Sequence, residues 1–522
     1  MQKMTRRQVL KWGGVGAAGL ALPLGVLQIP LARIRSIESM TSPATRPFQR
    51  PLPIPPVLAP VRSDGEADYY EITQKPGVAH LLPGLTTPIW GYNGIFPGPT
   101  IEARSGRKTI IRQMNDLPVP VSTHLHGGHT PPSSDGHPMD FLLPVDPSPF
   151  QASLTDGQMK QFMSPSGLGR SLHMHMQQSK EYVYPNTQRA TTLWYHDHRM
   201  DFTGAQVYRG LAGFYLIRDK IEDELPLPKG DHEIPLMLTD RSFNADGSFF
   251  YPSLDPTLKT TPGVLGKYYN GMIGDTLLVN GAVQPFLEVS ATKYRFRLLN
   301  ASNARVYQLE LSSRQSFVQI GSDGGLLPAP AARQTIRISP AERFDVIVDF
   351  SQYPVGSQIV LKNLLGEGQT TDIMRFDVVR RAKDDSLIPK TLAPFEALNP
   401  ANASVTRTFQ FFYGLGMWTI NGQYFDPNRT DATPRLGATE IWEFTSDGNH
   451  PIHLHLVNFQ VLSRDGRAPD PEDTGYKDTI FLKAGEKARV IARFEDYRGL
   501  YVFHCHNAEH EDMRMMGQFE VM

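Results

Sequence analysis

The chain has 522 residues, of which 52 are lysine or arginine and 53 are aspartate or glutamate, and its sequence pI is about 7.0. This balance excludes the strongly basic surface expected of a nucleic-acid-binding protein, and it gives no acidic bias. The single cysteine excludes an intrachain disulfide. The roughly 460 residues that follow the N-terminal segments correspond to about three domains.

The N-terminus carries the twin arginines Arg6 and Arg7, followed by an uncharged run from Trp12 to Ala32. This pattern is typical of a twin-arginine export signal, which we place in residues 1–41. A membrane anchor is the alternative, because the run is long enough to span a bilayer, but its glycines and prolines weaken a spanning helix. We therefore expect the twin-arginine export machinery as a partner, a periplasmic or extracellular location, and no membrane association of the mature protein.

Residues 42–62 are rich in proline, which predicts an extended linker or a wrapping arm. Strand signals dominate the remainder of the chain, as short β-branched and aromatic runs between glycine, proline, asparagine and aspartate. A turn followed by a proline and a new strand recurs three times, at Asn93-Gly94, Asn280-Gly281 and Asn421-Gly422. Duplication explains this recurrence better than chance does, although Asn-Gly turns are common.

The repeat predicts an all-β chain of three β-sandwich domains, each opened by one of these turns. We place the first domain at residues 63–225, the second at 226–385 and the third at 400–522.

Two histidine pairs lie in the first of these domains, His124 with His126 and His196 with His198. Successive side chains of a strand point to opposite faces, so a spacing of two puts both imidazoles of a pair on one face, about 6.6 Å of chain apart. A single pair also occurs on exposed strands without any function. Two pairs in one domain indicate ligands that converge on one metal cluster.

The third domain adds further candidate ligands, which are His450, His453, His455, His504, Cys505, His506, His510 and Met515. In a strand, Cys505 faces one way while His504 and His506 face the other, so this tripeptide can serve two metal centres. A thiolate with two imidazoles and a weak axial thioether is the ligand set of a blue-copper site. The alternative is a buried structural cysteine beside a surface histidine cluster.

With the pairs His453/His455 and His504/His506 of the third domain, the chain has four histidine pairs. Their eight imidazoles are enough for a cluster of three coppers. His450 and His510 are then left for the separate site of Cys505 and Met515. The middle domain holds only His232, for which a structural role is expected. The first and third domains must therefore meet, with the second acting as a spacer.

The four histidine motifs, in this order and spacing, resemble those of the multicopper oxidases, and the resemblance runs from about Tyr69 to the C-terminus. The segments closest to the branch of spore-coat laccase, bilirubin oxidase and phenoxazinone synthase are residues 124–131, 191–198, 294–303, 320–328 and 510–512. The resemblance implies three cupredoxin-like, Greek-key β-sandwich domains. It also implies four copper ions as cofactors, one of type 1, one of type 2 and two of type 3.

Carried over by position, the implied type 1 ligands are His450, Cys505, His510 and Met515, the type 2 ligands are His124 and His453, and the type 3 ligands are His126, His196, His198, His455, His504 and His506. The resemblance places the trinuclear cluster between the first and third domains. It implies that electrons enter at type 1 copper and pass through Cys505 to His504 and His506, where dioxygen is reduced to water. An axial methionine implies a low-to-moderate type 1 potential.

Oxygen reduction also consumes protons, and two carboxylates match the proton donors or relays of the resembling laccases. Glu511 follows His510 directly, and Asp135 lies eleven residues after His124. A general acid must lie within hydrogen-bond reach of the oxygen or of its water chain. For Asp135 the alternative is a turn at residues 133–136, whose composition suits one.

An insertion at residues 158–177 departs from the close relatives because it contains methionine and histidine, including Met159, Met163, Met174 and Met176. Thioethers and imidazoles suit Cu(I), so metal recruitment is one reading and a flexible loop is the other. Its place in the first domain, away from the type 1 ligands, weakens the metal-oxidase reading. His80, His129 and His137 have no ligand assignment, and we expect solvated or hydrogen-bonded roles for them.

These observations predict a laccase-like oxidase that takes electrons from small aromatic reductants, namely phenols, aromatic amines or bilirubin-like compounds, with dioxygen as the acceptor. The first alternative is an oxidase of Cu(I) or Mn(II) in metal tolerance. The second is a non-catalytic interaction protein on the same scaffold, but such proteins typically lack several ligands. We expect no nucleic-acid partner.

Overall fold

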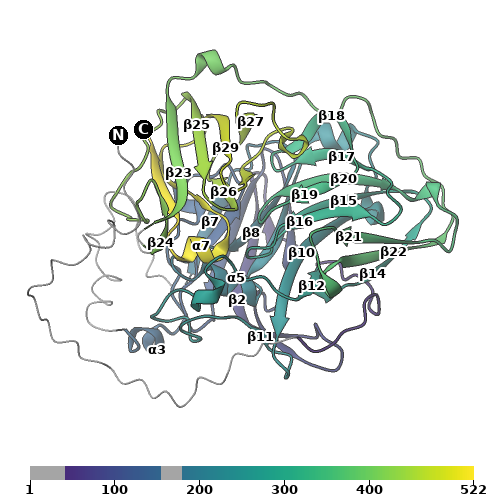
Figure 1. Ribbon diagram of the computed structural model, residues 1–522, viewed down its shortest axis with the longest axis horizontal. Coiled ribbons are helices and arrows are strands. Elements are labelled where there is room, and N and C mark those ends of the chain that lie inside the picture. Colours follow the sequence, from purple (N-terminus) through teal and green to yellow (C-terminus); the bar gives the residue numbers. More distant parts are fainter. Residues whose placement is uncertain (1–41, 155–178, 415) are drawn as a thin grey trace, which may run out of the picture. The chain divides into compact units, whose positions relative to one another are not determined.

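The computed structural model describes residues 42–154, 179–414 and 416–522, so the signal region and the whole methionine- and histidine-containing insertion lie outside it. Six β-sheets in three pairs make up the described chain (Figure 1). This arrangement confirms the predicted all-β fold of three sandwiches. Among the described residues, no helix is both long enough and apolar enough to cross a membrane. The domain boundaries given above stay a prediction.

The first sandwich pairs a five-stranded sheet with a four-stranded one. The larger sheet contains β1 (Arg62–Ser63), β2 (Ala67–Ala79), β3 (Thr87–Tyr92), β5 (Lys108–Asn115) and β7 (Ser179–Tyr184), and the smaller contains β4 (Gly98–Arg104), β6 (Thr123–His126), β8 (Thr191–Asp197) and β9 (Ala212–Arg218). Tyr70, Ile111, Tyr182 and Leu193 are among the buried residues between the sheets.

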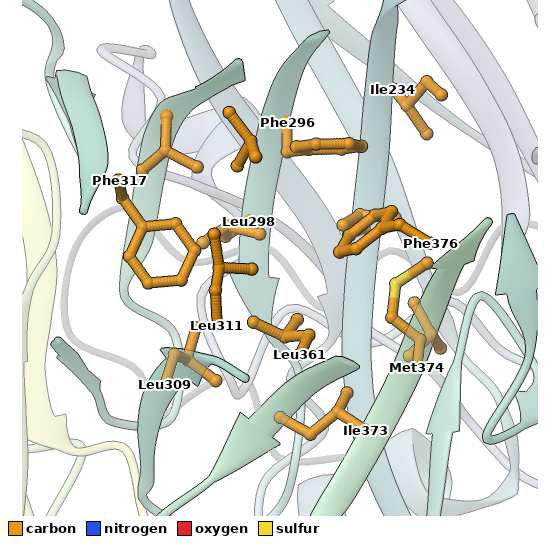
Figure 2. Close-up of a cluster of buried hydrophobic side chains, with 14 of the residues drawn as sticks. Ile234, Phe296, Leu298, Leu309, Leu311, Phe317, Leu361, Ile373, Met374 and Phe376 are labelled. Carbon is orange, nitrogen blue, oxygen red and sulfur yellow. The ribbon is translucent and has the colours of Figure 1, made fainter. Parts of the chain in front are cut away.

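The middle sandwich has the largest core. Its eight-stranded sheet contains β10 (Glu233–Phe243), β11 (Phe249–Phe250), β12 (Thr276–Val279), β13 (Ala282–Val283), β15 (Lys293–Asn300), β17 (Phe317–Ser322), β18 (Gly325–Arg333) and β20 (Arg343–Asp349), and its five-stranded sheet contains β14 (Phe286–Ser290), β16 (Tyr307–Leu311), β19 (Ile336–Ile338), β21 (Gln358–Asn363) and β22 (Asp372–Arg380). Figure 2 shows Phe296 of one sheet beside Phe376 of the other, with ring centroids 5.1 Å apart. Packing of this kind holds the two sheets face to face.

The third sandwich resembles the first in its sheet sizes. Its five-stranded sheet contains β23 (Thr406–Gly414), β24 (Met417–Ile420), β25 (Thr439–Ser446), β27 (Phe459–Arg464) and β29 (Lys487–Arg493), and its four-stranded sheet contains β26 (His450–Leu454), β28 (Thr479–Leu482), β30 (Gly499–Cys505) and β31 (Met516–Val521). Every residue of β8 and β26 is buried, and so are six of the seven residues of β30. These strands are therefore covered on both faces and not only on the core side.

The three predicted turns fold alike. Asn93, Asn280 and Asn421 all have left-handed backbones, with φ of 56°, 49° and 53°, and a glycine with positive φ follows each of them. Two consecutive residues with positive φ make the tight type I′ turn that an Asn-Gly pair favours. In each copy the asparagine N–H and Oδ1 also bond to the backbone O and N–H of one residue on an earlier strand, Thr73, Met237 or Gln410. This shared docking supports the duplication inferred from the sequence.

The proline-rich segment forms an arm. Leu52 of this segment is buried in the core of the middle sandwich, where its N–H donates to the Phe286 carbonyl over 2.7 Å. Further along, the Leu58 N–H donates to the Thr100 carbonyl of the first sandwich over 2.8 Å. The arm thus contacts two sandwiches.

Short helices connect the strands. The α-helices are α2 (Pro132–Asp135), α3 (Ser148–Gln151), α5 (Thr203–Arg209), α6 (Lys220–Glu224) and α7 (Ala508–Asp512), and the 3₁₀-helices are η3 (Gly230–His232), η4 (Gly266–Tyr268), η5 (Phe350–Gln352), η6 (Gly368–Thr370), η7 (Pro400–Asn402) and η8 (Pro471–Asp473). α7 follows β30 and packs against α5 of the first sandwich (Figure 1).

Candidate metal centres

Strand pairing in the first and third sandwiches brings the histidine pairs together. In the first sandwich, β6 runs antiparallel to β8 and His124 stands opposite His196. In the third, β26 runs antiparallel to β30 and His453 stands opposite His504. Directly opposed residues of an antiparallel pair have neighbouring side chains. Each pair of strands therefore presents histidines from two motifs to the same space.

The eight imidazoles of the four pairs form one buried cluster between the first and third sandwiches, and none of them is more than 5% exposed. The Nε2 atoms of His124 and His453 are 3.4 Å apart. The Nε2 atom of His504 lies 3.3 Å from that of His198 and 3.3 Å from that of His455. Histidines of the first and third sandwiches therefore lie in one group.

Burial lowers the pKa of seven of these imidazoles, and neighbouring imidazoles lower it further. The pKa of His196 falls to about 4 through burial. The residues whose pKa lies well below the usual value are His124, His126, His198, His453, His455 and His506. These histidines are neutral at physiological pH, which is the form that ligates a metal.

The donor atoms that face the cluster fit metal binding. His126 Nδ1, His196 Nε2 and both ring nitrogens of His506 are buried and have no hydrogen-bond partner in the described chain. Buried polar atoms without a partner are costly unless another group, such as a metal ion, binds them. The opposite ring nitrogens of several cluster histidines are held by carbonyls, as in His124 Nδ1 to the Asp135 carbonyl over 2.6 Å and His453 Nδ1 to the Asp478 carbonyl over 2.9 Å. These bonds leave a lone pair directed at the cluster.

A second group lies on the other face of β30. Cys505 Sγ is 3.4 Å from His450 Nδ1 and 3.6 Å from His510 Nδ1, and the two Nδ1 atoms are 3.2 Å apart. Met515 is fully buried in the same apolar cluster as Cys505, and its carbonyl accepts the Cys505 N–H. Burial raises the pKa of the Cys505 thiol. A bound cation would reverse this effect, because a coordinating thiol loses its proton.

Cys505 joins the two groups through the backbone alone. Its side chain faces His450 and His510, while its neighbours His504 and His506 lie in the histidine cluster. The alternation predicted for this strand is therefore confirmed. A group that contains sulfur and a group of histidines are therefore joined by neighbouring residues of one strand.

Family models described as multicopper oxidase match residues 75–149 with 167–222, residues 250–376 and residues 396–522. A laccase from Bacillus stratosphericus is 40% identical, with 91% of this chain and 99% of the laccase covered. The chain belongs to the multicopper oxidase family. It is therefore a copper-dependent oxidase built from three cupredoxin-like domains.

Further similarities agree with this assignment. This multicopper oxidase is 36% identical to a bilirubin oxidase from Albifimbria verrucaria, over 92% of the chain and 82% of that relative. The solved structure of a laccase from Pediococcus acidilactici superimposes with a TM-score of 0.78 at 30% identity, covering 92% of this chain and 95% of that one. Residues 3–23 match the twin-arginine signal family, so the oxidase is an exported protein, as predicted.

The two predicted carboxylates both lie against the histidine cluster of the oxidase. The Glu511 side chain is 3.2 Å from His198 Nδ1 and 3.3 Å from His504 Nδ1, and neither of its oxygens has a hydrogen-bond partner in the described chain. Asp135 is fully buried, and its Oδ2 lies 2.8 Å from His455 Nδ1. Burial raises the pKa of Asp135 well above its usual value. Residues 133–136 also form a turn, which was the alternative considered for Asp135. The turn is the end of α2, where Gly136 has a φ of 78°.

The helix α7 carries His510 and Glu511 between the two groups. Asn507 starts it, because the Asn507 Oδ1 accepts the N–H groups of Glu509 and His510. Glu509 ties the helix to the middle sandwich by accepting the Tyr251 hydroxyl, the Met272 N–H and the Asn303 amide, over 2.7 to 2.9 Å. The middle sandwich is therefore more than the spacer that the sequence suggested.

Trp418 of β24 covers the sulfur-containing group and was missed by sequence reasoning. Its ring stacks on His510 with centroids 3.9 Å apart, and its edge meets His450 at 5.2 Å. The indole N–H donates to the Tyr269 carbonyl over 2.9 Å. His450 and His510 are 0% and 2% exposed, so neither imidazole presents itself to solvent. No motif marks this tryptophan, because a lone aromatic residue in a strand reads as core.

The remaining predicted histidines have structural roles. His232 Nε2 lies 3.3 Å from Ser290 Oγ, and His137 Nε2 lies 3.1 Å from Gln518 Oε1. His129 Nδ1 lies 2.9 Å from Asp496, and His80 is exposed. Met159, Met163, Met174 and Met176 lie outside the described residues.

Proposed function

We propose that this laccase-like multicopper oxidase takes electrons singly from phenols, aromatic amines or bilirubin-like compounds at a type 1 copper and reduces dioxygen to water at a trinuclear cluster. The observation that carries the proposal is the tripeptide 504–506, which links a sulfur-containing group to an eight-histidine cluster. Relatives named laccase and bilirubin oxidase support the substrate class.

The proposed ligands follow from the two groups. Those of type 1 are His450, Cys505, His510 and Met515, those of type 2 are His124 and His453, and those of type 3 are His126, His196, His198, His455, His504 and His506. This set implies four copper ions. When bound, the coppers supply one-electron acceptance at the first site and multi-electron delivery to dioxygen at the second.

The polypeptide performs the remaining work. Cys505 provides the shortest covalent connection between the centres, through His504 and His506. Glu511, which lies against two cluster imidazoles and lacks another partner, is placed to hand protons to the oxygen side. Asp135 orients His455 and His124, one through its carboxylate and the other through its carbonyl, and can serve the same proton path.

Neither alternative is favoured. An oxidase of Cu(I) or Mn(II) would need a metal-recruiting element near the first centre. The described residues there include the aromatic residues Trp418, Tyr413 and Tyr269. A carboxylate, that of Asp447, also lies there, 3.5 Å from His450 Nε2. A non-catalytic scaffold protein would lack ligands, whereas every ligand position here is filled.

Oxygen uptake by the copper-loaded protein tests the proposal, with a dimethoxyphenol and with Cu(I) as parallel donors and with Cys505→Ser as the control. We expect rapid uptake with the phenol and none in the control. Uptake with Cu(I) alone, lost on replacing the four methionines of the insertion, would assign the protein to metal detoxification. No uptake with either donor, despite full copper loading, would contradict both oxidase readings.

A further inference from the structure

The middle sandwich contributes a charged side chain that reaches the histidine cluster. Arg343, the first residue of β20, is fully buried, and all five of its N–H donors have an acceptor. They are received by the carbonyls of Thr192, Ala341 and Asp323 and by both carboxylate oxygens of Asp478. The acceptors come from all three sandwiches. The guanidinium is therefore fixed in position by its surroundings.

Asp478, directly before β28, contacts Arg343 and also two cluster histidines. Its Oδ1 receives Arg343 Nη1 over 2.7 Å and lies 3.1 Å from His126 Nε2. Its carbonyl lies 2.9 Å from His453 Nδ1. A bond at Nε2 of His126 leaves Nδ1 to face the cluster, whereas a bond at Nδ1 of His453 leaves Nε2 to do so. One residue thereby sets opposite tautomers in two imidazoles.

The backbone next to His126 packs closely against the ion pair of Arg343 and Asp478. A Cβ atom at Gly127 would lie 2.6 Å from Arg343 Nη2 and 2.7 Å from Asp478 Oδ2, and the φ of Gly127 is +82°. The glycine after the first histidine motif is thus required by close approach as well as by its backbone conformation. The ion pair and the imidazole form one packed unit.

We propose that Arg343 is a positioning residue of the oxygen-reducing centre, which holds Asp478 so that His126 and His453 present the correct nitrogens. The inference rests on the proposed function, because it takes both histidines as copper ligands. A bidentate arginine is required, since a lysine would keep the charge but supply a single point of contact.

Lys477 supplies a matched control. It is as buried as Arg343 and belongs to the same ionic network, where it pairs with Asp323 over 2.9 Å and with Glu342 over 3.0 Å. It makes no described contact with a candidate ligand or with the Asp478 carboxylate. Lys477→Met removes a buried charge from the network but neither of the groups that pair Arg343 with the Asp478 carboxylate.

The test compares the copper-loaded full chain with Arg343→Lys, Asp478→Asn and Lys477→Met. Four quantities are measured: copper per chain, the blue absorption band of the Cys505 site, the type 2 electron paramagnetic resonance signal, and oxygen uptake with a phenol. For Arg343→Lys and Asp478→Asn we expect an altered or diminished type 2 signal, an unchanged blue band, and a loss of oxygen uptake of about 10- to 100-fold. For Lys477→Met we expect a lower melting temperature with the parent's type 2 signal.

A parental type 2 signal in both Arg343→Lys and Asp478→Asn would overturn the proposal. So would an equal change of that signal in Lys477→Met, because the network would then act only by stabilising the fold. A parent protein without a blue band or oxygen uptake would instead refute the proposed function. The two failures are therefore distinguishable, and Asp478→Asn keeps the test decisive if Arg343→Lys does not fold.

Discussion

Glu511 lies between His198 and His504 with both carboxylate oxygens buried and without another partner. If it hands on protons, Glu511→Gln keeps the shape of the side chain but removes this capacity. We expect oxygen uptake at saturating phenol to fall by about 100-fold or more, the effect typical of losing a general acid. Anaerobic bleaching of the blue band by the phenol should stay at the parental rate, because it involves only the Cys505 side.

An unchanged rate of oxygen uptake in Glu511→Gln would exclude the proton role. Equal losses of bleaching and uptake would indicate damage to both centres instead of a block in proton supply.

Trp418 packs against both imidazoles of the sulfur-containing group, which are themselves buried, so an electron donor contacts surrounding residues and not a ligand. Trp418→Leu removes the ring that stacks on His510. Such a stacking contact contributes about 0.5 to 1.5 kcal/mol of interaction free energy. We expect kcat/KM for a phenol to fall by about three- to tenfold. Tyr424→Leu is the control, since Tyr424 is an exposed aromatic residue of the third sandwich, whereas Trp418 is buried. Equal effects of the two substitutions would refute a specific role of Trp418.

At the scale of single elements, α7 depends on its anchor in the middle sandwich. Glu509 accepts three hydrogen bonds from that sandwich, and burial raises its pKa to about 7. Glu509→Ala leaves the three donors unpaired, which costs about 3 kcal/mol. We expect a melting temperature lowered by several degrees and a weaker blue band per bound copper, because α7 carries His510. Glu520→Ala, at an exposed position of β31, should change neither quantity.

A parental blue band and melting temperature in Glu509→Ala would show that α7 holds its place without this anchor.

The elements that carry the site were largely predictable, because period-two alternation fixes the faces of a strand. That rule placed the side chain of Cys505 on one face of its strand and those of His504 and His506 on the other face. It also identified all four histidine pairs. It could not predict which strands pair, so the opposition of His124 to His196 and of His453 to His504 came only from the structure. Asp478 and Trp418 were missed for a related reason. Their partners are distant in sequence, and neither lies in a recognisable pattern.

At the scale of the whole molecule, the sequence indicated that the first and third sandwiches meet, because neither holds a complete set of histidines. It described the middle sandwich as a spacer, since only His232 was counted there. Arg343 and the partners of Glu509 correct this description, because they reach both candidate centres. Buried arginines and asparagines have no periodic signature, so such contacts follow only from the packed structure.

The interface of the first and third sandwiches contains a titratable pair, His129 with Asp496. Burial lowers the pKa of His129, but the bond and charge of Asp496 outweigh this effect and raise the pKa above 6.5. A histidine with a raised pKa contributes stability that is full below about pH 6.5 and is lost as the pH rises through the raised value. We expect the melting temperature to fall with rising pH in this window, and less steeply in His129→Gln.

The melting temperature could instead change equally steeply with pH in the parent and in His129→Gln, between about pH 6 and 8. That result would show that the pair does not couple protonation to stability. The comparison should be made at one copper loading, since a bound metal also stabilises the fold.

The central claim is that single electrons from a phenol are collected and delivered together to dioxygen. The most direct measurement is the ratio of phenol molecules oxidised to oxygen molecules consumed by the copper-loaded full chain, with a simultaneous assay for hydrogen peroxide. We expect four phenols per dioxygen, no peroxide, and no uptake in Cys505→Ser. Two phenols per dioxygen with stoichiometric peroxide, or uptake that survives Cys505→Ser, would contradict the claim.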